Sequence, residues 1–314
     1  MKRIGMNNSL TLEDAFKNFL FSKNSEGLSE KTIASYKGHL KIIANDLDTS
    51  MLLSDLTKED FQVVIDKMRK RRLAQNTIAS YVRIFRTFLS WARTENLTDV
   101  YIPMYKTEET IKETYTDKEL LKLLKKPNIN KCKFSEYRNW VIVNFLLNSG
   151  ARAATIRSIQ IQDVDLENNI VLYRHTKNKK SQVIPLCSSM VIILKEYLYY
   201  REGAANDYLF CKEDGDQMSD DALKSAIRRY NKRRGVHKSS IHLFRHTYAK
   251  KYLLDCDGNA FSLQRLLGHS TLEMTRHYCN IYNVDLLKNY DDFSPLQKLN
   301  SKEKKISLKK ERCN

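Results

Sequence analysis

The chain has 314 residues, of which 54 are Lys or Arg and 37 are Asp or Glu, so its formal net charge is +17. This length predicts about two domains, and the charge favours a polyanionic partner, with nucleic acid first and an anionic membrane surface second. A solvated basic surface without a partner is the alternative that charge alone leaves open. With only 9 Gly and 4 Pro, a turn-dense all-β architecture is disfavoured.

Membrane, disulfide and metal chemistry find no support in the sequence. The six cysteines form no CxxC pair, and no apolar run approaches the roughly 18 residues of a membrane span. The first ten residues lack the apolar segment of a signal peptide. We therefore expect a cytoplasmic protein that holds no metal and no cofactor and does not bind membranes.

The first hundred residues predict four amphipathic helices. Thr11, Ser29, Thr57 with Asp60, and Asn76 stand before four patterns in which apolar residues recur at steps of three and four. The apolar positions are Leu12, Phe16 and Phe19, then Ile33, Tyr36, Leu40, Ile43 and Leu47, then Phe61, Val64, Ile65 and Met68, then Ile78, Tyr81, Val82, Phe85, Phe88 and Leu89. Four such helices can close one core, which predicts an N-terminal helical domain over residues 1–98.

This region also contains a run of basic residues, and a segment that resembles a linker comes after it. Arg69-Lys-Arg-Arg72 is typical of a solvated charged face, but beside the other basic clusters it favours phosphate contact. Residues 99–115 lose the helical periodicity and contain Pro103, so they are predicted to link two domains.

The second region predicts a mixed domain over residues 116–299. It begins at the capping box Thr116-Asp-Lys-Glu119, and an apolar helix over 136–148 ends at Gly150. Strands are expected at Ser158–Asp163, Asn169–Tyr173 and Gln182–Leu186, and helices at 188–200, 220–231, 243–254 and 260–267. Residues 300–314 are predicted to be a basic tail. The fold class is thus mainly α with a small antiparallel β-sheet.

Side chains that could take part in catalysis lie near the ends of predicted helices and strands in this region. His242 and Arg245 share one face of a predicted helix, and His269 lies on a tight turn before another helix. Arg152 follows the helix that ends at Gly150, Lys177 lies in the turn between two strands, and Tyr278 follows at helical spacing. Taken singly, each is more often a cap, a core residue or a solvated charge.

Together these residue types suit phosphodiester chemistry without a metal. Two arginines can grip a phosphate and stabilise the charge that develops on it. A tyrosine can attack phosphorus and hold the cleaved strand, and a lysine of lowered pKa can protonate the leaving oxygen.

The motifs around these residues resemble those of the tyrosine recombinase (phage integrase) family, in its simple two-domain form. IHLFRHTYAKKYL resembles the family box H-x-L-R-H-T-F-A, and LQRLLGHSTLEMTRHY resembles L-x-x-L-L-G-H-x-x-x-x-x-T-x-x-Y. HTKNKKSQVIPL resembles the lysine hairpin G-K-G-x-K-x-R-x-V-P-L, and NSGARAATIRSI resembles T-G-L-R-x-S-E-L. The resemblance covers roughly residues 9–295.

The resemblance implies a role for each residue at the scissile phosphate. Arg152 and Arg245 would grip it, and His269 would donate a hydrogen bond to it. Lys177 would protonate the 5′ leaving oxygen, and His242 would act as an acid or base.

The resemblance also implies a nucleophile and an assembly. Tyr278 would attack, giving a 3′-phosphotyrosyl link and a free 5′-hydroxyl. The N-terminal helical domain would bind one face of double-stranded DNA and the catalytic domain the other. Four protomers would then exchange strands through a Holliday junction, as a tetramer on paired sites.

Two positions depart from the family pattern. Thr155 stands where the family has an acid three residues after its first arginine, and Gln182 replaces the hairpin arginine. The hairpin also lacks its glycines, so Lys179 or Lys180 can share the role of Lys177. The stretch after Tyr278 either docks on a neighbouring protomer or folds back on its own domain.

The function expected from this reading is site-specific DNA recombination, as an integrase or transposase of a mobile element. Xer-like resolution of chromosome dimers is the nearest alternative. A type IB topoisomerase would use the same chemistry without paired sites. A DNA-binding regulator with a decayed catalytic set is the remaining rival.

Overall fold

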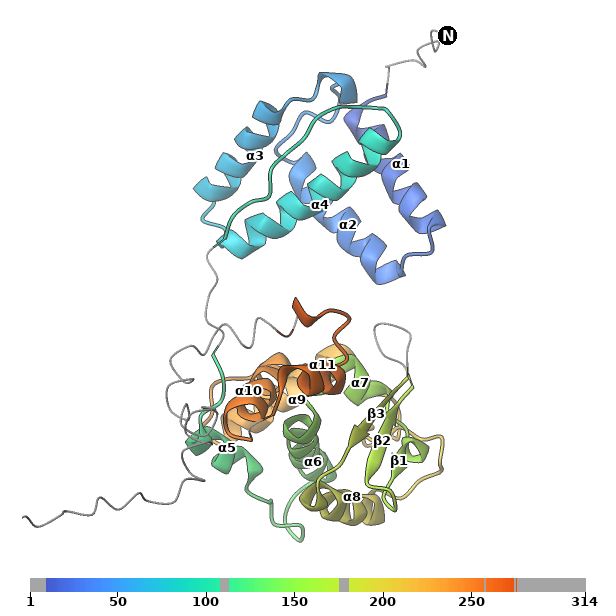
Figure 1. Cartoon of the computed structure of the whole chain (residues 1–314), viewed down its shortest axis with the longest axis vertical. Coiled ribbons are helices and arrows are strands. Elements are labelled where there is room, and N and C mark those ends of the chain that lie inside the picture. The colour runs from blue at the N-terminus through green and yellow to red at the C-terminus, as the bar shows by residue number, and fades with distance from the viewer. Residues whose placement is uncertain (1–9, 108–112, 175–180, 257, 274, 276–314) are drawn as a thin grey trace, which may run out of the picture. The chain divides into compact units, whose positions relative to one another are not determined.

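The structure is a computed structural model that describes residues 10–107, 113–174, 181–256, 258–273 and 275. The chain divides into two compact units, Met1–Thr110 and Ile111–Asn314. Both are built mainly of α-helices, and the second also contains a small antiparallel sheet (Figure 1), which confirms the predicted fold class. Lys177, Tyr278 and the segment after it, including the predicted basic tail, lie outside the described residues.

The described part of the first unit contains α1 (Leu12–Ser25), α2 (Glu30–Ala44), η1 (Leu53–Asp55), α3 (Lys58–Lys70) and α4 (Gln75–Thr94). Polar side chains start three of these helices as predicted. Thr11 and Ser29 accept backbone N–H bonds at the starts of α1 and α2, and Thr57 and Asp60 form a reciprocal capping box on α3. The helix α4 begins after Ala74 without a side-chain cap.

Aromatic rings fill the core of this unit. Phe61 stacks on Phe85 with 4.2 Å between ring centroids, and Phe16 meets Phe88 edge to face at 4.8 Å. Ile102 is 5 % exposed in the same core, although the sequence placed it in the 99–115 linker. Its burial shows that apolar residues after α4 extend the first unit beyond residue 98.

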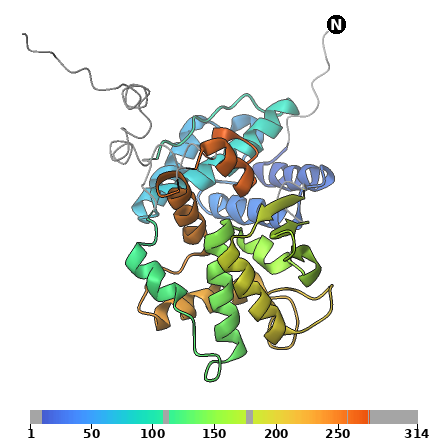
Figure 2. The ribbon, with the colours of Figure 1, turned by 60° about the horizontal axis from the view of Figure 1, so that its bottom comes forward.

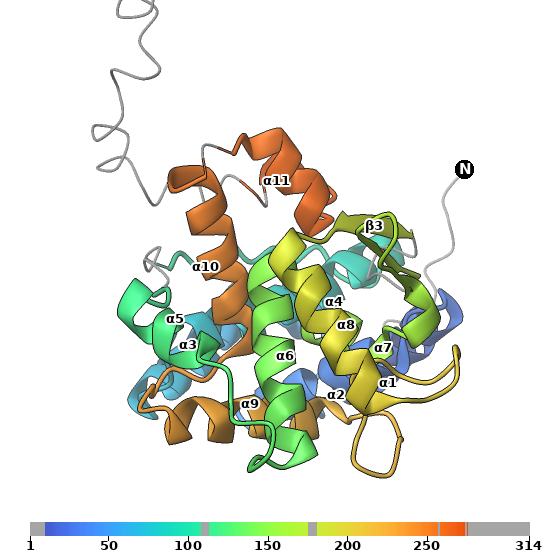
Figure 3. The same ribbon diagram turned by 90° about the horizontal axis from the view of Figure 1, so that it is seen from below.

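The second unit contains α5 (Asp117–Leu124), α6 (Phe134–Ser149), α7 (Ala153–Ser158), η2 (Ile161–Asp163), β1 (Val164–Asp165), β2 (Ile170–Tyr173), β3 (Gln182–Pro185), α8 (Ser188–Arg201), α9 (Asp220–Arg233), α10 (Ile241–Leu254) and α11 (Ala260–Leu267). The apolar helix α6 is buried on most sides and runs through the middle of this unit. It packs against α8 (Figure 2) and against α10 (Figure 3). No helix in the described ranges combines the length and the apolar character that a membrane crossing requires.

The three strands form one antiparallel sheet in the order β1-β2-β3. Val171 pairs with Ile184 and Tyr173 with Gln182, so the predicted hairpin around Lys177 is confirmed for its two strands. The side chains of Val171, Tyr173 and Ile184 are buried, which leaves the alternate positions to the outer face.

The strand predicted over Ser158–Asp163 is wrong. Ser158 ends α7, and residues 161–163 form the 3-10 helix η2, which Gln160 and Asp163 start with reciprocal bonds. The first strand is the short β1 that follows. A local capping arrangement therefore prevails over the weak alternation of this segment.

Candidate active site

The end of α6 provides the first wall of the site. Gly150 ends this helix with φ 60° and ψ 24°, a left-handed conformation that glycine adopts without strain. A Cβ at this position would lie 2.6 Å from Cδ1 of Tyr248 and 2.8 Å from Cδ2 of Leu267. Both the backbone conformation and the close packing therefore require glycine here, and the carbonyl of Gly150 is turned toward α10.

Arg245 lies at the centre of the site, on α10, and is 5 % exposed. Its Nη1 donates to the Gly150 carbonyl at 2.9 Å and its Nη2 to the Leu267 carbonyl at 2.8 Å. The same Nη2 lies 2.8 Å from Nε2 of His269. These bonds fix the plane of the guanidinium group, because its donors form a rigid fork.

Arg152 reaches the same place from another element. It precedes α7, and its Nη1 donates to the Leu267 carbonyl at 3.3 Å. Two guanidinium groups from distant parts of the sequence thus converge on one carbonyl oxygen, at the end of α11. These bonds orient both cations.

His269 follows Gly268, which turns the chain after α11 with φ 62°. The imidazole is 9 % exposed, and its Nδ1 lies 2.9 Å from Oγ1 of Thr275. Burial first, and then the charges of Arg245 and Arg152, lower the pKa of His269 to about 4. The ring is therefore neutral at pH 7, with Nε2 accepting from Arg245 and Nδ1 donating to Thr275.

Of the other three predicted site residues, the structure describes only His242. His242 lies on α10 one turn before Arg245 and is exposed. Lys177 and Tyr278 lie outside the described residues, so three of the six predicted residues meet in space and a fourth shares a helix with one of them. In the part of the chain that the structure describes, no three His, Cys, Asp or Glu side chains gather to hold a metal ion.

Comparison with known families identifies the family of the chain. Residues 113–283, more than half of the chain, match the model of the phage integrase family. The chain belongs to this family. It is a tyrosine recombinase, and the resemblance stated from the motifs is confirmed.

Curated relatives of this tyrosine recombinase carry Xer names. The tyrosine recombinase XerA of Saccharolobus solfataricus is 28% identical over 250 residues, covering 80% of this chain and 78% of its own. The tyrosine recombinase XerC of Thermodesulfovibrio yellowstonii is 25% identical over 294 residues, covering 88% and 94%.

Solved structures share the fold at lower identity. The Tn1549 transposon integrase in complex with transposon right end DNA has a TM-score of 0.72 at 16% identity, and the match covers 90% of this chain and 99% of that one. A lambda integrase dimer bound to a core site has a TM-score of 0.69 at 17% identity, with coverage of 84% and 97%.

The two residues that depart from the family pattern both line the candidate site. Gln182 starts β3 and donates through Nε2 to the Leu266 carbonyl at 3.0 Å and to the Arg265 carbonyl. It therefore ties the base of the lysine hairpin to the end of α11, next to His269. Thr155 is 7 % exposed and lines the same narrow pocket as Arg152 and Arg245.

Two contributors were not assigned a role from the sequence. Thr275 partners the His269 ring, and the carbonyl of Leu267 receives both arginines. The threonine stands in the family box, six positions after the histidine. Its place in the box was therefore the one feature of the sequence that could have pointed to it. A backbone carbonyl leaves no such signal, because every residue has one.

Proposed function

We propose that this recombinase cuts and rejoins double-stranded DNA, with Tyr278 as nucleophile and Arg152 and Arg245 stabilising the charge on the scissile phosphate. The observation that carries the proposal is the meeting of both guanidinium groups at the Leu267 carbonyl, beside His269. A phosphate entering there would find two fixed cations and an imidazole at hydrogen-bonding distance from one of them.

The bonds and protons of the proposed reaction balance without a nucleotide. The hydroxyl oxygen of Tyr278 bonds to phosphorus, and the bond from phosphorus to the 5′-oxygen breaks. His242 takes the phenolic proton, and Lys177 gives a proton to the leaving oxygen. Attack by a 5′-hydroxyl on the 3′-phosphotyrosyl group rejoins the strand and frees Tyr278.

His269 must change state to donate a hydrogen bond to that phosphate. In the free site its Nε2 accepts from Arg245, so it has no proton to give on that side. An anionic phosphate beside the ring favours the charged imidazolium and raises its pKa. We therefore expect His269 to take up a proton as DNA enters the site.

Trapping of the covalent intermediate tests this proposal. DNA sites are first selected from a random-sequence library by binding to the purified protein. Each site is then nicked a few nucleotides beyond the scissile phosphate, so that the short fragment with the new 5′-hydroxyl diffuses away after cleavage and the strand cannot be rejoined. The wild type should form a covalent adduct that Tyr278→Phe abolishes while DNA binding persists. If the protein binds every selected site and forms an adduct on none of them, the result supports a DNA-binding regulator. Relaxation of supercoiled plasmids that lack a selected site would instead support a type IB topoisomerase.

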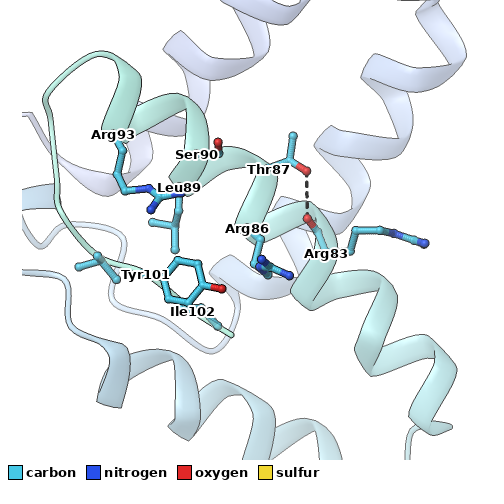
Figure 4. A pocket seen from close by; sticks show the side chains of 9 residues that line it. Arg83, Arg86, Thr87, Leu89, Ser90, Arg93, Tyr101 and Ile102 are labelled. Carbon is cyan, nitrogen blue, oxygen red and sulfur yellow. Dashed lines mark hydrogen bonds between the residues drawn. The ribbon is translucent and has the colours of Figure 1, made fainter. Parts of the chain in front are cut away.

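The first unit offers a basic face for the same DNA. Arg83, Arg86 and Arg93 line a surface pocket of about 310 Å³ on α4, together with Tyr101 (Figure 4). The Tyr101 ring lies 5.6 Å from Cζ of Arg86 and 5.5 Å from Cζ of Arg93. The ring holds the two cations on its face without neutralising them.

The basic run at 69–72 is less available for contact with DNA phosphates than the sequence suggested. Arg71 forms an ion pair with Asp46, and Arg69 lies 3.3 Å from a carboxylate oxygen of Asp66. We therefore assign DNA phosphate contact in this unit to the α4 arginines. The double variant Arg86→Ala with Arg93→Ala should flatten the salt dependence of DNA binding by about two counterions, whereas Arg71→Ala should leave the slope near that of the wild type.

Two cellular roles fit this chemistry. Integration or transposition of a mobile element is the role that the sequence led us to expect, and resolution of chromosome dimers is favoured by the names of the Xer relatives. A plasmid carrying the DNA that flanks the coding region separates the roles. Excision or insertion of that DNA supports the mobile element, whereas conversion of plasmid dimers to monomers at one site supports the resolvase.

Assembly as a tetramer on paired sites is part of the proposal. A lambda integrase tetramer bound to a Holliday junction has the same fold, with a TM-score of 0.67. Mass photometry of this recombinase on a synthetic four-way junction should show four protomers. A stable one-to-one complex at saturating protein would contradict it.

A further inference from the structure

The catalytic helix α10 carries two functional faces. His242 and Arg245 stand one turn apart on the face that serves the site. Phe244 and Thr247 are also one turn apart, but they lie on another face of the helix. Residues 114–119, at the start of the second unit, bind this second face.

The contacts to the second face run along the length of α10. The backbone N–H of Tyr115 donates to Oγ1 of Thr247 at 2.9 Å, and the Tyr115 ring lies 4.4 Å from the Phe244 ring. Toward the end of the helix, Nζ of Lys251 lies 2.5 Å from a carboxylate oxygen of Asp117. Tyr115 and Thr247 are buried, at 3 % and 0 % exposure.

Asn231, near the end of α9, and Lys238, in the loop before α10, bind the same segment. Nζ of Lys238 donates to the Thr114 carbonyl and to Glu119, each at 3.0 Å. Nδ2 of Asn231 donates to the Tyr115 hydroxyl at 2.9 Å and to the Lys238 carbonyl at 2.8 Å. The segment that enters the second unit is therefore fastened to the start, middle and end of the helix that holds Arg245.

We infer that Thr247 is a positioning residue for strand cleavage, which acts by fastening α10 to residues 114–119 so that Arg245 keeps its place at the Leu267 carbonyl. We name these contacts the entry latch: residues 114–119 with Lys238, Phe244, Thr247 and Lys251. The inference rests on the proposed function, because it assigns the latch a role in a reaction that Arg245 supports. Since the latch begins where the chain enters from the first unit, it also joins that connection to the catalytic helix.

The hydroxyl of Thr247 is the part of the latch that can be removed alone. It accepts from Tyr115 and donates to the Leu243 carbonyl at 2.8 Å. A valine has the same shape but leaves the buried N–H of Tyr115 without its acceptor, so the two segments separate or shift. A serine keeps both bonds and loses only a methyl group.

The test compares Thr247→Val and Thr247→Ser in the full chain, on the nicked sites described above. At saturating protein, Thr247→Val should form the covalent adduct about tenfold or more slowly than the wild type, while its Kd for DNA changes less than about twofold. Thr247→Ser should restore most of the rate. Val191→Ala, at a buried position on α8, serves as the control that lowers Tm without touching the latch.

Two results would overturn the inference. One is a Thr247→Val protein that is folded at the assay temperature and forms the adduct as fast as the wild type. The other is a slowing that Val191→Ala reproduces at an equal loss of Tm, since this would reduce Thr247 to a general stabilising residue. A wild type that binds the sites but forms no adduct would instead refute the proposed function.

Discussion

Acidification provides a direct test of the charge arrangement around His269. The folded protein holds this ring neutral, because burial and two guanidinium groups lower its pKa to about 4. In the unfolded chain the ring titrates near 6.5. Between pH 6.5 and about pH 4 the ring is protonated in the unfolded state but neutral in the folded state. The free energy of unfolding should therefore fall as the pH falls from 6.5 toward 4. The contribution of His269 is fully present above pH 6.5.

The size of this effect follows from the pKa difference. A difference of one pKa unit corresponds to about 1.4 kcal/mol, so lowering the pKa from 6.5 to about 4 corresponds to at most about 3–4 kcal/mol. Partial access of water and relaxation of the charged state reduce it, and we expect about 1–3 kcal/mol between pH 7 and pH 4. The matched variant is His269→Gln, whose amide offers an acceptor and a donor without titrating.

Urea unfolding of the full chain can isolate this term. Trp140 is 4 % exposed in the core of the second unit, so its fluorescence reports that unit once Trp91, in the first unit, is replaced by Phe. The wild-type background should lose about 1–3 kcal/mol more than the His269→Gln background over this pH range. Equal losses in both, or an imidazole resonance of His269 that titrates near 6.5, would refute the arrangement that we describe.

Three substitutions probe the rest of the site. Arg245→Lys keeps a charge but loses the fork, so adduct formation should fall about 100-fold or more, with DNA affinity changed less than about threefold in a filter-binding assay. Gly150→Ala should cost about 2–4 kcal/mol in urea unfolding of the second unit, because it combines a left-handed φ with contacts under 3 Å; stability within about 0.5 kcal/mol of the wild type would contradict this. Gln182→Ala should cost about 1 kcal/mol and slow the adduct, since it frees the hairpin from α11; an unchanged rate would show that the tie has no catalytic use.

Local signals in the sequence predicted most helices well. Thr57 with Asp60, Thr116 with Glu119, and Gly150 mark helix ends through bonds that close within four residues, so the sequence contains the whole interaction. The wrong strand at 158–163 lacked this kind of information. Whether so short a segment pairs or coils depends on what packs against it, which the alternation of side chains does not record.

In the first unit, too, the sequence alone did not show which basic residues are available on the surface. The run at 69–72 stood out because its charges are adjacent in sequence, yet Arg71 is paired with Asp46. The α4 arginines are spread over three turns, and helical spacing would have placed Arg83, Arg86 and Arg93 on one face. Their proximity to Tyr101 could not be predicted, because it depends on how the chain folds back after α4.

The meeting of Arg152, Arg245 and His269 explains why family motifs succeeded where spacing could not. Each residue depends on a backbone feature nearby: the left-handed Gly150, the carbonyl of Leu267, and the turn at Gly268. Carbonyl oxygens orient the guanidinium groups before DNA arrives, so little reorganisation is needed when a phosphate enters. Gly150 stands in the same box as Arg152, and Leu267 and Gly268 stand in the same box as His269. The boxes therefore carry geometric information that individual residue types lack.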